Sequence, residues 1–246
     1  LNDSSKIAQF KLALERLNNS YPCLEVIIKE NEYIVAGVGE LHLEVALNDL
    51  RDMLSNDVTF SLGEPTVEFS ETITQKSETY LKKSTNKLNR IYVSAEPLGE
   101  DLVSAIQNNE LPMENPKELA RFLVKKYDWD PNDAKKLWFF EDTNCVVDQT
   151  AGADYLTEIK DSIRSGFQMA VNEGGLAGEK MRGVRFNIED VKIHSDSTHR
   201  RGNQIIPASR KAFLAAQLGA QPKLMEPIFL AEIQTVLDVI GQVYKL

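Results

Sequence analysis

The sequence predicts an α+β fold in three parts, residues 1–62, 63–225 and 226–246. Residues 1–62 show, in order, the hydrophobic patterns of a helix, two strands, a helix and a strand. Gly63-Glu64-Pro65 then interrupts the pattern, as expected at a boundary between units. The chain ends on a further strand and helix, so we expect another unit of the first kind to begin there.

The first part places two amphipathic helices around a hairpin. The first helix is predicted by apolar residues that share one face: Ile7, Phe10, Leu14 and Leu17. Residues 24–29 and 33–38 are apolar and rich in β-formers, and the polar stretch between them indicates a hairpin. The second helix carries Leu43, Leu47, Leu50 and Leu54, and residues 58–62 are predicted to form a strand. This order is that of a ferredoxin-like βαββαβ unit without its opening strand.

The middle part contains several predicted strands. Residues 66–73 alternate between apolar and polar side chains, and residues 90–95 form a second strand. Residues 74–89 between them are polar and are predicted to form a long loop or ribbon. Residues 145–148 are predicted to form a further short strand.

Helices in the middle part are indicated by their caps. Asn115-Pro116-Lys117-Glu118 is a capping box with proline at the first helical position. Asp130-Pro131 starts a short helix that we expect to run through Trp138. A longer helix is predicted by residues spaced four apart, Tyr155, Ile159, Ile163 and Phe167, and Gly174-Gly175 ends it.

The last predicted strand of the middle part changes phase along its length. Residues 182–193 alternate, but the phase slips at Glu189-Asp190, which a β-bulge explains. Residues 194–204 are predicted to be a polar loop, and Pro207 to open a helix. A connector at residues 221–227 then leads to a predicted strand and helix at residues 228–234 and 235–246.

Composition excludes several classes of protein. The 246 residues include 28 Lys and Arg against 37 Asp and Glu, and 42% are hydrophobic, which is typical of globular domains. The sequence contains no apolar run near the roughly 18 residues that a membrane span requires. Cys23 and Cys145 are too few for a disulfide framework or a cysteine-based metal site, so reduced thiols in the cytosol or nucleus are expected. The start at Leu1 suggests a piece of a longer protein.

Two stretches are basic although the chain carries a net charge of −9. Residues 81–90 hold Lys82, Lys83, Lys87 and Arg90 without an acid, and residues 177–211 have a net charge of +4. Local basic stretches on an acidic body suit contact with a polyanion. The alternative is that both are ordinary solvated surface. If both loops lie at one end of a small α/β domain, they form a basic tip.

Catalytic and nucleotide-binding alternatives have weak support in the sequence. Gly37-Val38-Gly39 invites a dinucleotide site, but the third glycine of that fingerprint falls on His42. We therefore expect a tight turn there and a partly buried, structural His42. His194, Asp196 and His199 could hold a metal or act with a serine in hydrolysis, yet the further ligands and the nucleophile elbow are missing.

The loop at residues 194–204 carries chemistry suited to RNA. Arg200 and Arg201 can donate in pairs to phosphate. The ring of His199 can stack on a base, and Asn203 and Gln204 can bond to base edges or sugar hydroxyls. Loops that connect regular elements are also where proteins usually present function.

Several motifs resemble the translation elongation factor 2 family. Residues 33–44, YIVAGVGELHLE, resemble its AGxGELHLE segment, and RGVRFN at 182–187 with DV at 190–191 resembles its RxVRxNxxDV strand. HSDSTHR at 194–200 and QIIP at 204–207 resemble the HADAIHR loop and the QIIP segment that follows it. Residues 83–92 resemble KSPNKHNRIY, and residues 226–234 resemble EPxxLVEIQ, so the motifs occur in the family's order.

The resemblance implies a domain organisation and a function. Residues 1–62 correspond to most of domain III, residues 63–225 to domain IV, with a ribosomal-protein-S5-domain-2-like fold, and residues 226–246 to the start of domain V. The GTPase domain, with its GTP and magnesium, would lie upstream, so this part is expected to be no enzyme and to hold no cofactor or metal. In the cytoplasm, domain IV would reach the decoding centre during GTP-dependent translocation.

The resemblance also implies contact residues and partners. The partners are the ribosomal RNA of the decoding centre, tRNA and mRNA, with no membrane. The residues predicted to contact RNA are Lys83, Asn86, Lys87, Asn89, His194, Asp196, His199, Arg200, Arg201 and Gln204. His199 stands at the position that the family converts to diphthamide, which adds the diphthamide-synthesis enzymes as partners.

Both loops depart from the family pattern. Arg201 and Asn203 replace glycines, and Thr85 and Leu88 replace proline and histidine. These departures allow three interpretations, and the intact GELHLE segment and the paired histidines His194 and His199 favour the first, an elongation factor 2 of eukaryotic or archaeal type. The first is a divergent elongation factor that lacks diphthamide. The other two are paralogous GTPases, one of the spliceosome and one of large-ribosomal-subunit maturation.

Overall fold

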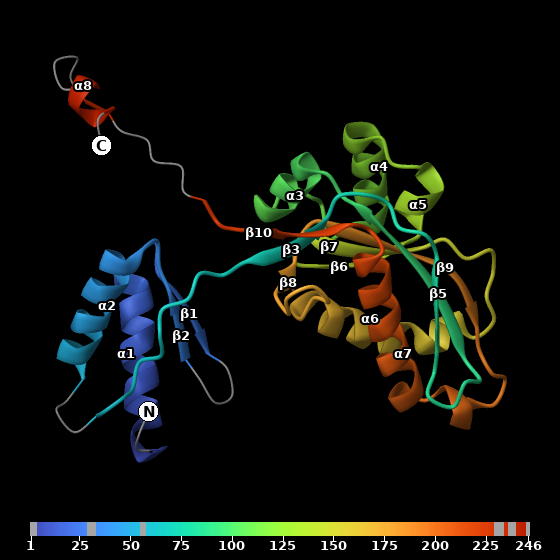
Figure 1. The fold of residues 1–246 in the computed structure, drawn as a ribbon, viewed down its shortest axis with the longest axis horizontal. Helices are drawn as coiled ribbons and strands as arrows, with labels where there is room; N and C mark the ends of the chain where they lie inside the picture. The colour runs from blue at the N-terminus through green and yellow to red at the C-terminus, as the bar shows by residue number, and fades with distance from the viewer. Residues whose placement is uncertain (1–3, 29–32, 55–57, 229–233, 236–239, 245–246) are drawn as a thin grey trace. The chain divides into compact units, whose positions relative to one another are not determined.

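The structure is a computed structural model that describes residues 4–28, 33–54, 58–228, 234–235 and 240–244. Contacts divide the chain into two compact units, Leu1–Thr66 (unit 1) and Val67–Leu246 (unit 2). Both combine helices with sheets, which confirms the mixed α/β class (Figure 1). The assignment of the parts to ferredoxin-like and other named folds stays a prediction. The described helices are too short or too polar to cross a membrane.

Unit 1 is built from two helices and a hairpin, as predicted. After a short 3-10 helix (Ser4–Lys6), α1 (Ile7–Ser20) precedes and α2 (Glu40–Met53) follows the antiparallel strands β1 (Glu25–Ile28) and β2 (Tyr33–Ala36) in the chain. The predicted turn at residues 30–32 lies outside the described residues. The core of this unit is apolar and includes Phe10, Leu14, Leu17, Leu24, Ala46, Leu50 and Val58.

The strand predicted at residues 58–62 is wrong. These residues form no ladder with the part of unit 1 that the structure describes. Val58 and Phe60 instead pack their side chains against the core of unit 1. Alternation alone cannot decide such a case, because a strand also requires a neighbouring backbone edge.

The turn between β2 and α2 has a structural explanation, as expected. A Cβ atom on Gly37 would lie 2.9 Å from Cδ2 of Leu43, so a side chain there would require the Leu43 side chain to shift. The backbone N–H of Val38 donates to Nδ1 of His42 at 3.3 Å. His42 is half-buried against Tyr21, and its role in unit 1 is structural.

Unit 2 is organised around a five-stranded sheet. The strands, in spatial order, are β4 (Tyr80–Lys83), β5 (Arg90–Pro97), β9 (Val184–Lys192), β7 (Asn144–Asp148) and β6 (Leu137–Glu141). All neighbours are antiparallel except β7 and β9. Helices α6 (Leu156–Asn172) and α7 (Gly202–Leu218) cover one face of this sheet (Figure 1).

The core of unit 2 lies between that face and the two helices. Ile91, Val93, Phe186 and Ile188 alternate along β5 and β9 and are fully buried. The ring of Phe213 lies 5.1 Å from that of Phe186 in an edge-to-face arrangement. Helices α6 and α7 cross closely at Gly166 and Ser209, since glycine has no Cβ atom. A Cβ atom at position 166 would clash with Ser209.

The predicted bulge in the long strand is confirmed. Tyr92 pairs with Asp190 and Val93 pairs with Ile188, so Glu189 has no partner in the register. The extra residue returns Val191 to the core, where it is 5% exposed. It also turns Lys192 to the opposite face of the sheet.

A smaller helical layer packs near the other side of the sheet. It consists of α3 (Glu100–Gln107), α4 (Pro116–Tyr127) and α5 (Pro131–Lys135), and its apolar residues pack with Cys145 and Val147 of β7. The predicted caps are confirmed: Asn115 accepts from the N–H of Lys117, and Asp130 accepts from that of Asn132.

Several elements of unit 2 differ from the prediction. The short helix α5 ends at Lys135 instead of Trp138, because Leu137 begins strand β6. Helix α3 was not predicted, since its apolar stripe spans only eight residues. The polar stretch at residues 74–89, predicted as a long loop or ribbon, contains strand β4, and its antiparallel pairing with β5 fits the ribbon alternative.

Helix α7 begins at Gly202, five residues before the predicted start at Pro207. The N–H groups of Gln204 and Ile205 donate to the carbonyl of Arg201, so the first turn closes ahead of the proline. Ile205 is fully buried, and Oε1 of Gln204 accepts from the backbone N–H of Asn86. These tertiary contacts make residues 202–206 helical, although the local sequence of this polar segment does not predict a helix.

A three-stranded sheet pairs a strand from the beginning of unit 2 with a strand that follows α7. Strand β3 (Ser70–Ile73) lies between β10 (Pro222–Met225) and β8 (Lys180–Met181). The predicted connector at residues 221–227 is therefore partly a strand, and the strand predicted from residue 66 begins only at Ser70. The strand and helix predicted beyond residue 228 lie mostly outside the described residues, which include α8 (Ile240–Val243).

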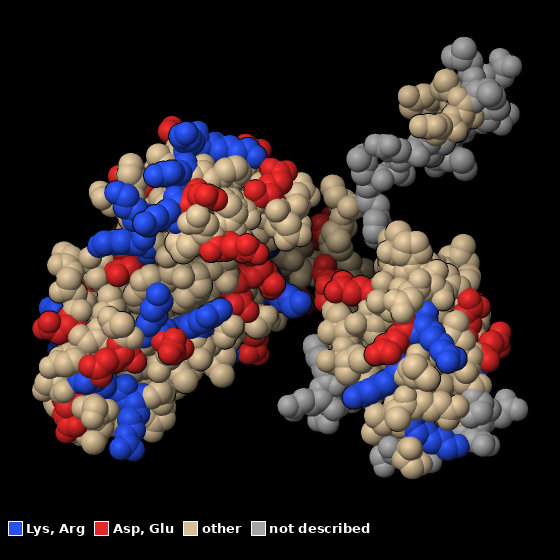
Figure 2. All heavy atoms as spheres, turned by 180° about the vertical axis from the view of Figure 1, so that it is seen from behind, with Lys and Arg blue, Asp and Glu red and all other residues tan. Residues whose placement is uncertain are grey.

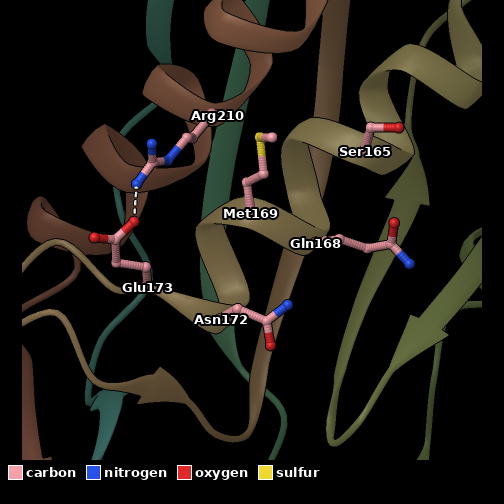
Figure 3. A pocket seen from close by; sticks show the side chains of 6 residues that line it. All are labelled: Ser165, Gln168, Met169, Asn172, Glu173 and Arg210. Carbon is pink, nitrogen blue, oxygen red and sulfur yellow. Dashed lines mark hydrogen bonds and ion pairs between the residues drawn. The ribbon is translucent and has the colours of Figure 1, made fainter. Parts of the chain in front are cut away.

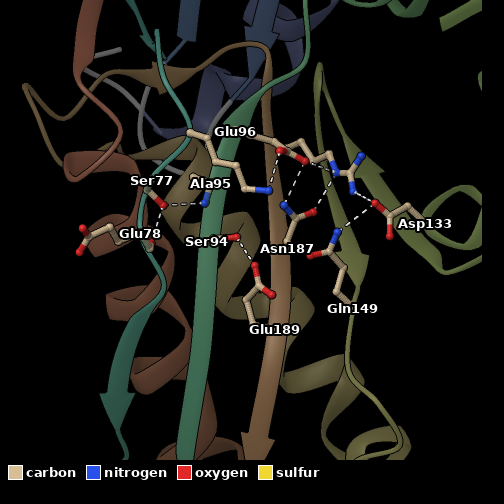
Figure 4. A network of polar contacts seen from close by, with 11 residues as sticks. Ser77, Glu78, Ser94, Ala95, Glu96, Asp133, Gln149, Asn187 and Glu189 are labelled. Atoms are coloured by element: carbon tan, nitrogen blue, oxygen red, sulfur yellow. Dashed lines mark hydrogen bonds and ion pairs between the residues drawn. The ribbon is translucent and has the colours of Figure 1, made fainter. Parts of the chain in front are cut away.

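A buried ion-pair network fixes α5 to the sheet (Figure 4). Nε of Arg185 in β9 lies 2.9 Å from Oε1 of Glu96 in β5, and Nη2 pairs with Asp133 of α5. The guanidinium lies 4.4 Å from the ring centroid of Trp129. Asn187 joins the same network through Glu96 at 3.1 Å. Nε and Nη2 of Arg185 each pair with a carboxylate, and these pairs offset the cost of burying the charge of the arginine.

A second buried charge, Glu71 of β3, holds the loop after α6. Its carboxylate accepts from the N–H groups of Ala177 (2.8 Å), Leu176 (2.9 Å) and Glu179 (3.1 Å) and from the amide of Gln217. Burial by itself raises the pKa of Glu71, but these hydrogen bonds outweigh it, and the pKa lies below its ordinary value.

We expect Glu71→Gln to destabilise unit 2 by about 2 kcal/mol, because an amide NH2 then faces backbone donors. The carboxylate contributes fully above the unfolded pKa, about 4.3, and its contribution is lost as pH falls through the lower folded pKa. Urea unfolding of both proteins between about pH 3 and pH 7 should therefore show a stability difference that shrinks in acid. Glu68→Gln, at an exposed site, is the control. A pH-independent difference would contradict this role of the charge.

Candidate nucleic-acid interface

The sheet brings two distant loops to one end of unit 2. Residues 84–89 connect β4 to β5, and residues 193–201 connect β9 to α7. Arg90 pairs with Lys83 on one side and with Lys192 on the other, so both loops leave the sheet at the same level. We call these two loops together the tip. Lys87 and His199 therefore lie at the same end of their unit.

Two asparagines of the first loop, Asn86 and Asn89, bind the second loop, and we call them the asparagine clamp. Their Nδ2 groups both donate to the carbonyl oxygen of His199, at 2.9 and 2.8 Å. Oδ1 of Asn89 accepts from the N–H of His194 at 3.1 Å, and the N–H of Asn86 donates to Gln204 at 3.0 Å. The clamp fixes the backbone of His199 and leaves its ring outside.

The clamp changes the role of residues that the sequence assigned to RNA contact. Asn89 is fully buried and bonded to both loops, so it shapes the tip instead of presenting a surface to RNA. Asn86, Gln204 and His194 are half-buried, and each also contributes to the contact between the loops. Sequence reasoning found these positions but could not separate holding the loop from contacting a ligand.

The side chain of Arg200 also bonds to other groups of the protein. Its Nη2 and Nε donate to Oε2 of Glu158 in α6 at 2.6 and 3.1 Å, and its Nη1 donates to the carbonyl of His194. The guanidinium lies 4.1 Å from the ring centroid of Tyr155, and the side chain is 9% exposed. Arg200 thus anchors the second loop to α6, and Arg201 is the arginine that faces solvent.

The remaining predicted residues form an open surface. Lys83, Lys87, Asp196, His199 and Arg201 are exposed. Lys87 has a φ of 62°, in the left-handed region, where the first loop turns back. The rings of His199 and His194 meet edge to face at 4.9 Å. Figure 2 shows blue Lys and Arg atoms close to red Asp and Glu atoms over much of unit 2.

The second loop adopts its path without glycine. Residues Ser197–Arg200 form a 3-10 helix, and Oδ1 of Asp196 accepts from the N–H of Thr198 at 2.9 Å. This backbone hydrogen bond holds the pKa of Asp196 below its ordinary value, and nearby His199 acts in the same direction. Arg201 has a φ of −65°, and Asn203 has no positive φ, so neither position needs glycine's freedom.

The geometry gives little support to a metal or a hydrolytic triad. Nε2 of His199 lies 3.9 Å from Oδ2 of Asp196, which is beyond hydrogen-bond reach. Nδ1 of His194 accepts from the backbone N–H of Asp196, so that nitrogen is already occupied. Across the described ranges, no three His, Cys, Asp or Glu residues gather so that they could hold a metal ion.

A hollow on the helical side of unit 2 offers no better site (Figure 3). It is shallow and is lined by Ser165, Gln168, Met169, Asn172, Glu173 and Arg210. Arg210 is paired with Glu173, and Gln168 donates to Glu141 at 3.0 Å. The charged groups of this hollow bond to the protein, whereas Lys87 and Arg201 of the tip face solvent.

Comparison with known proteins identifies part of unit 2. Residues 104–221 match the family model of elongation factor G, domain IV. This stretch is just under half of the chain and contains the second loop and α7. The match supports an elongation-factor-family fragment.

A solved crystal structure of a protein from Thermus thermophilus is similar over 91% of this chain, with 19% sequence identity and a TM-score of 0.49. The similar region makes up 28% of that protein. The chain therefore spans a minor part of the length of the protein that it matches.

We expect Asn89→Ala to destabilise unit 2 by about 2 kcal/mol, because it leaves the His194 N–H and the His199 carbonyl without their buried partner. Asn89→Asp is the matched variant, since it keeps the acceptor for His194 and loses the donor to His199. Urea unfolding should rank wild type above both variants, and limited proteolysis should cut residues 193–201 faster in each. Equal protease resistance in all three proteins would show that the clamp does not hold the second loop.

Proposed function

We propose that this chain is part of a ribosomal translocation factor of the elongation factor 2 type, and that its tip contacts RNA at the decoding centre. The proposal places the exposed tip residues beside tRNA and mRNA during GTP-dependent translocation. GTP and magnesium would be bound by a GTPase domain outside this chain. The chain itself would bind and position RNA in the cytoplasm without performing catalysis.

One observation carries the proposal: two separate loops are clamped together so that exposed cations and an imidazole share one end of unit 2. Lys83, Lys87 and Arg201 provide charge for phosphates, and His199 adds a flat ring that can stack on a base. The clamp fixes the backbone before binding, so less conformational entropy is lost when RNA is bound. The family match of residues 104–221 supports the same conclusion.

The elongation factor 2 type is supported by residues that the two loops share with that family. NK at residues 86–87 lies in the first loop, NR at residues 89–90 spans the end of that loop and the start of β5, and HR at residues 199–200 lies in the second loop. In this structure Asn86, Asn89 and Arg200 hold the tip together, which gives these motifs a physical reason. We assign unit 1 to domain III and most of unit 2 to domain IV.

Diphthamide at His199 remains part of the proposal. The side chain is 47% exposed at the tip, so its imidazole is open to a modifying enzyme. Residues 201 and 203 have no positive φ, so the replaced glycines are not required for this conformation of the loop.

We expect His199→Ala combined with Arg201→Ala to weaken ribosome binding by about tenfold, since one stacking group and one phosphate contact are lost. Both side chains are exposed, so the unfolding free energy should change by less than about 0.5 kcal/mol. Co-sedimentation of the 246-residue chain with ribosomes at several salt concentrations measures the loss.

Arg121→Ala on α4 is the control, because it removes an exposed arginine away from the tip. Ribosome binding that is unchanged by the double variant would overturn the proposed role of the tip. Preferential co-purification with small nuclear RNA would favour the spliceosomal paralogue, and preferential binding to free large subunits the maturation paralogue.

A further inference from the structure

Three cations lie directly opposite one another on three adjacent strands of unit 2. The register pairs Lys83 of β4 with Arg90 of β5, and Arg90 with Lys192 of β9. Adjacent strands lie about 4.8 Å apart, so the three positions span about 10 Å in a line across the sheet. We call Lys83, Arg90 and Lys192 the cationic row. It lies where the strands lead into the tip.

The cationic row is on the open face of the sheet. Ile91 and Val191, the neighbours of Arg90 and Lys192, are buried in the core against α6 and α7. Side chains alternate along a strand, so Arg90 and Lys192 point to the opposite face. All three members of the row are exposed, whereas the second helical layer packs on β7, farther across the sheet.

None of the three cations of the row forms an ion pair with the described part of the protein. Like charges directly opposite each other across strands destabilise a sheet. Asp190 lies on this face in the next row, opposite Tyr92, and its Oδ1 accepts from the N–H of Val191 at 2.9 Å.

The bulge at Glu189 is what completes the row. Without the extra residue, the alternation of β9 would place Lys192 on the core face and Val191 on the open face. Tyr92 lies on the open face, two residues from Arg90, and is half-buried. An aromatic ring beside exposed cations on an open sheet is typical of surfaces that bind RNA.

We propose that the cationic row binds consecutive phosphates of an RNA backbone, so that the interface extends from the tip onto the open face of the sheet. Arg90 and Lys192 become new contact residues, with Tyr92 beside them for base stacking. A line of exposed cations without an enclosing pocket suits a repeating polyanion better than a single small anion. The choice of RNA as the polyanion rests on the proposed function.

The test uses the 246-residue chain with Arg90→Gln and Lys192→Gln combined and leaves the tip residues intact. The probe is a short fluorescein-labelled hairpin RNA, and fluorescence anisotropy gives its dissociation constant at several salt concentrations. We expect about tenfold weaker binding, and a slope of log affinity against log salt that is shallower by about 1.4 to 1.8, from 0.7 to 0.9 per phosphate contact.

Arg121→Gln with Lys125→Gln is the matched control. It removes the same charge from exposed positions on α4, which belongs to the second helical layer. An equal loss of binding in this control would overturn the proposal, because binding would then follow net charge. The row variant should unfold at the same or a higher denaturant concentration than wild type, since removing opposed like charges does not weaken the sheet.

The tip variant His199→Ala with Arg201→Ala separates this inference from the proposed function. Loss of RNA binding in both the tip and row variants supports both. Loss in the tip variant alone overturns the cationic row and leaves the proposed function in place. Loss in the row variant alone supports the row and overturns the role of the tip. If wild type does not bind the hairpin, or neither variant changes its affinity, both proposals fail.

Discussion

The carbonyl oxygen of His199 accepts two side-chain amides at once, and the shape of the tip depends on this contact. The donors, Asn86 and Asn89, come from a loop more than a hundred residues earlier in the chain. A backbone carbonyl held by two donors cannot move without losing both bonds, and the burial of Asn89 makes that loss costly. The second loop therefore has one path, and His199, Arg201 and Lys87 are exposed around a fixed centre.

The packed core of unit 2 positions the residues that make this contact. Close crossing of α6 and α7 at Gly166 positions the start of α7 and the Glu158 carboxylate that anchors Arg200. The bulge at Glu189 sets the phase of the strand that leads into the second loop. Packing of the core, and not the local preference of a polar loop, thus decides where the exposed groups of the tip lie.

Charged groups in this protein serve two different ends. Glu71 and Arg185 are buried, and each has several partners, so they fix a loop and a helix to the sheets. Lys87 and Arg201 of the tip and the three cations of the row are exposed and face solvent. An acidic chain that concentrates free positive charge at one end directs a polyanion to that end and disfavours contact elsewhere. Net charge alone therefore misrepresents the surface that this protein offers.

The sequence by itself determined the regular elements with strong periodicity or caps, such as α1, the hairpin, α4 and α6, and even the bulge in β9. These follow from local patterns that are read within a few residues. It also located both loops of the tip. Only the tertiary structure decided that Asn89 and Arg200 hold the tip while Arg201 faces outward, that α7 starts before Pro207, and that Arg90 lies between Lys83 and Lys192. Those outcomes depend on which distant backbone lies alongside, because pairing partners and burial are set by long-range packing that no local pattern encodes.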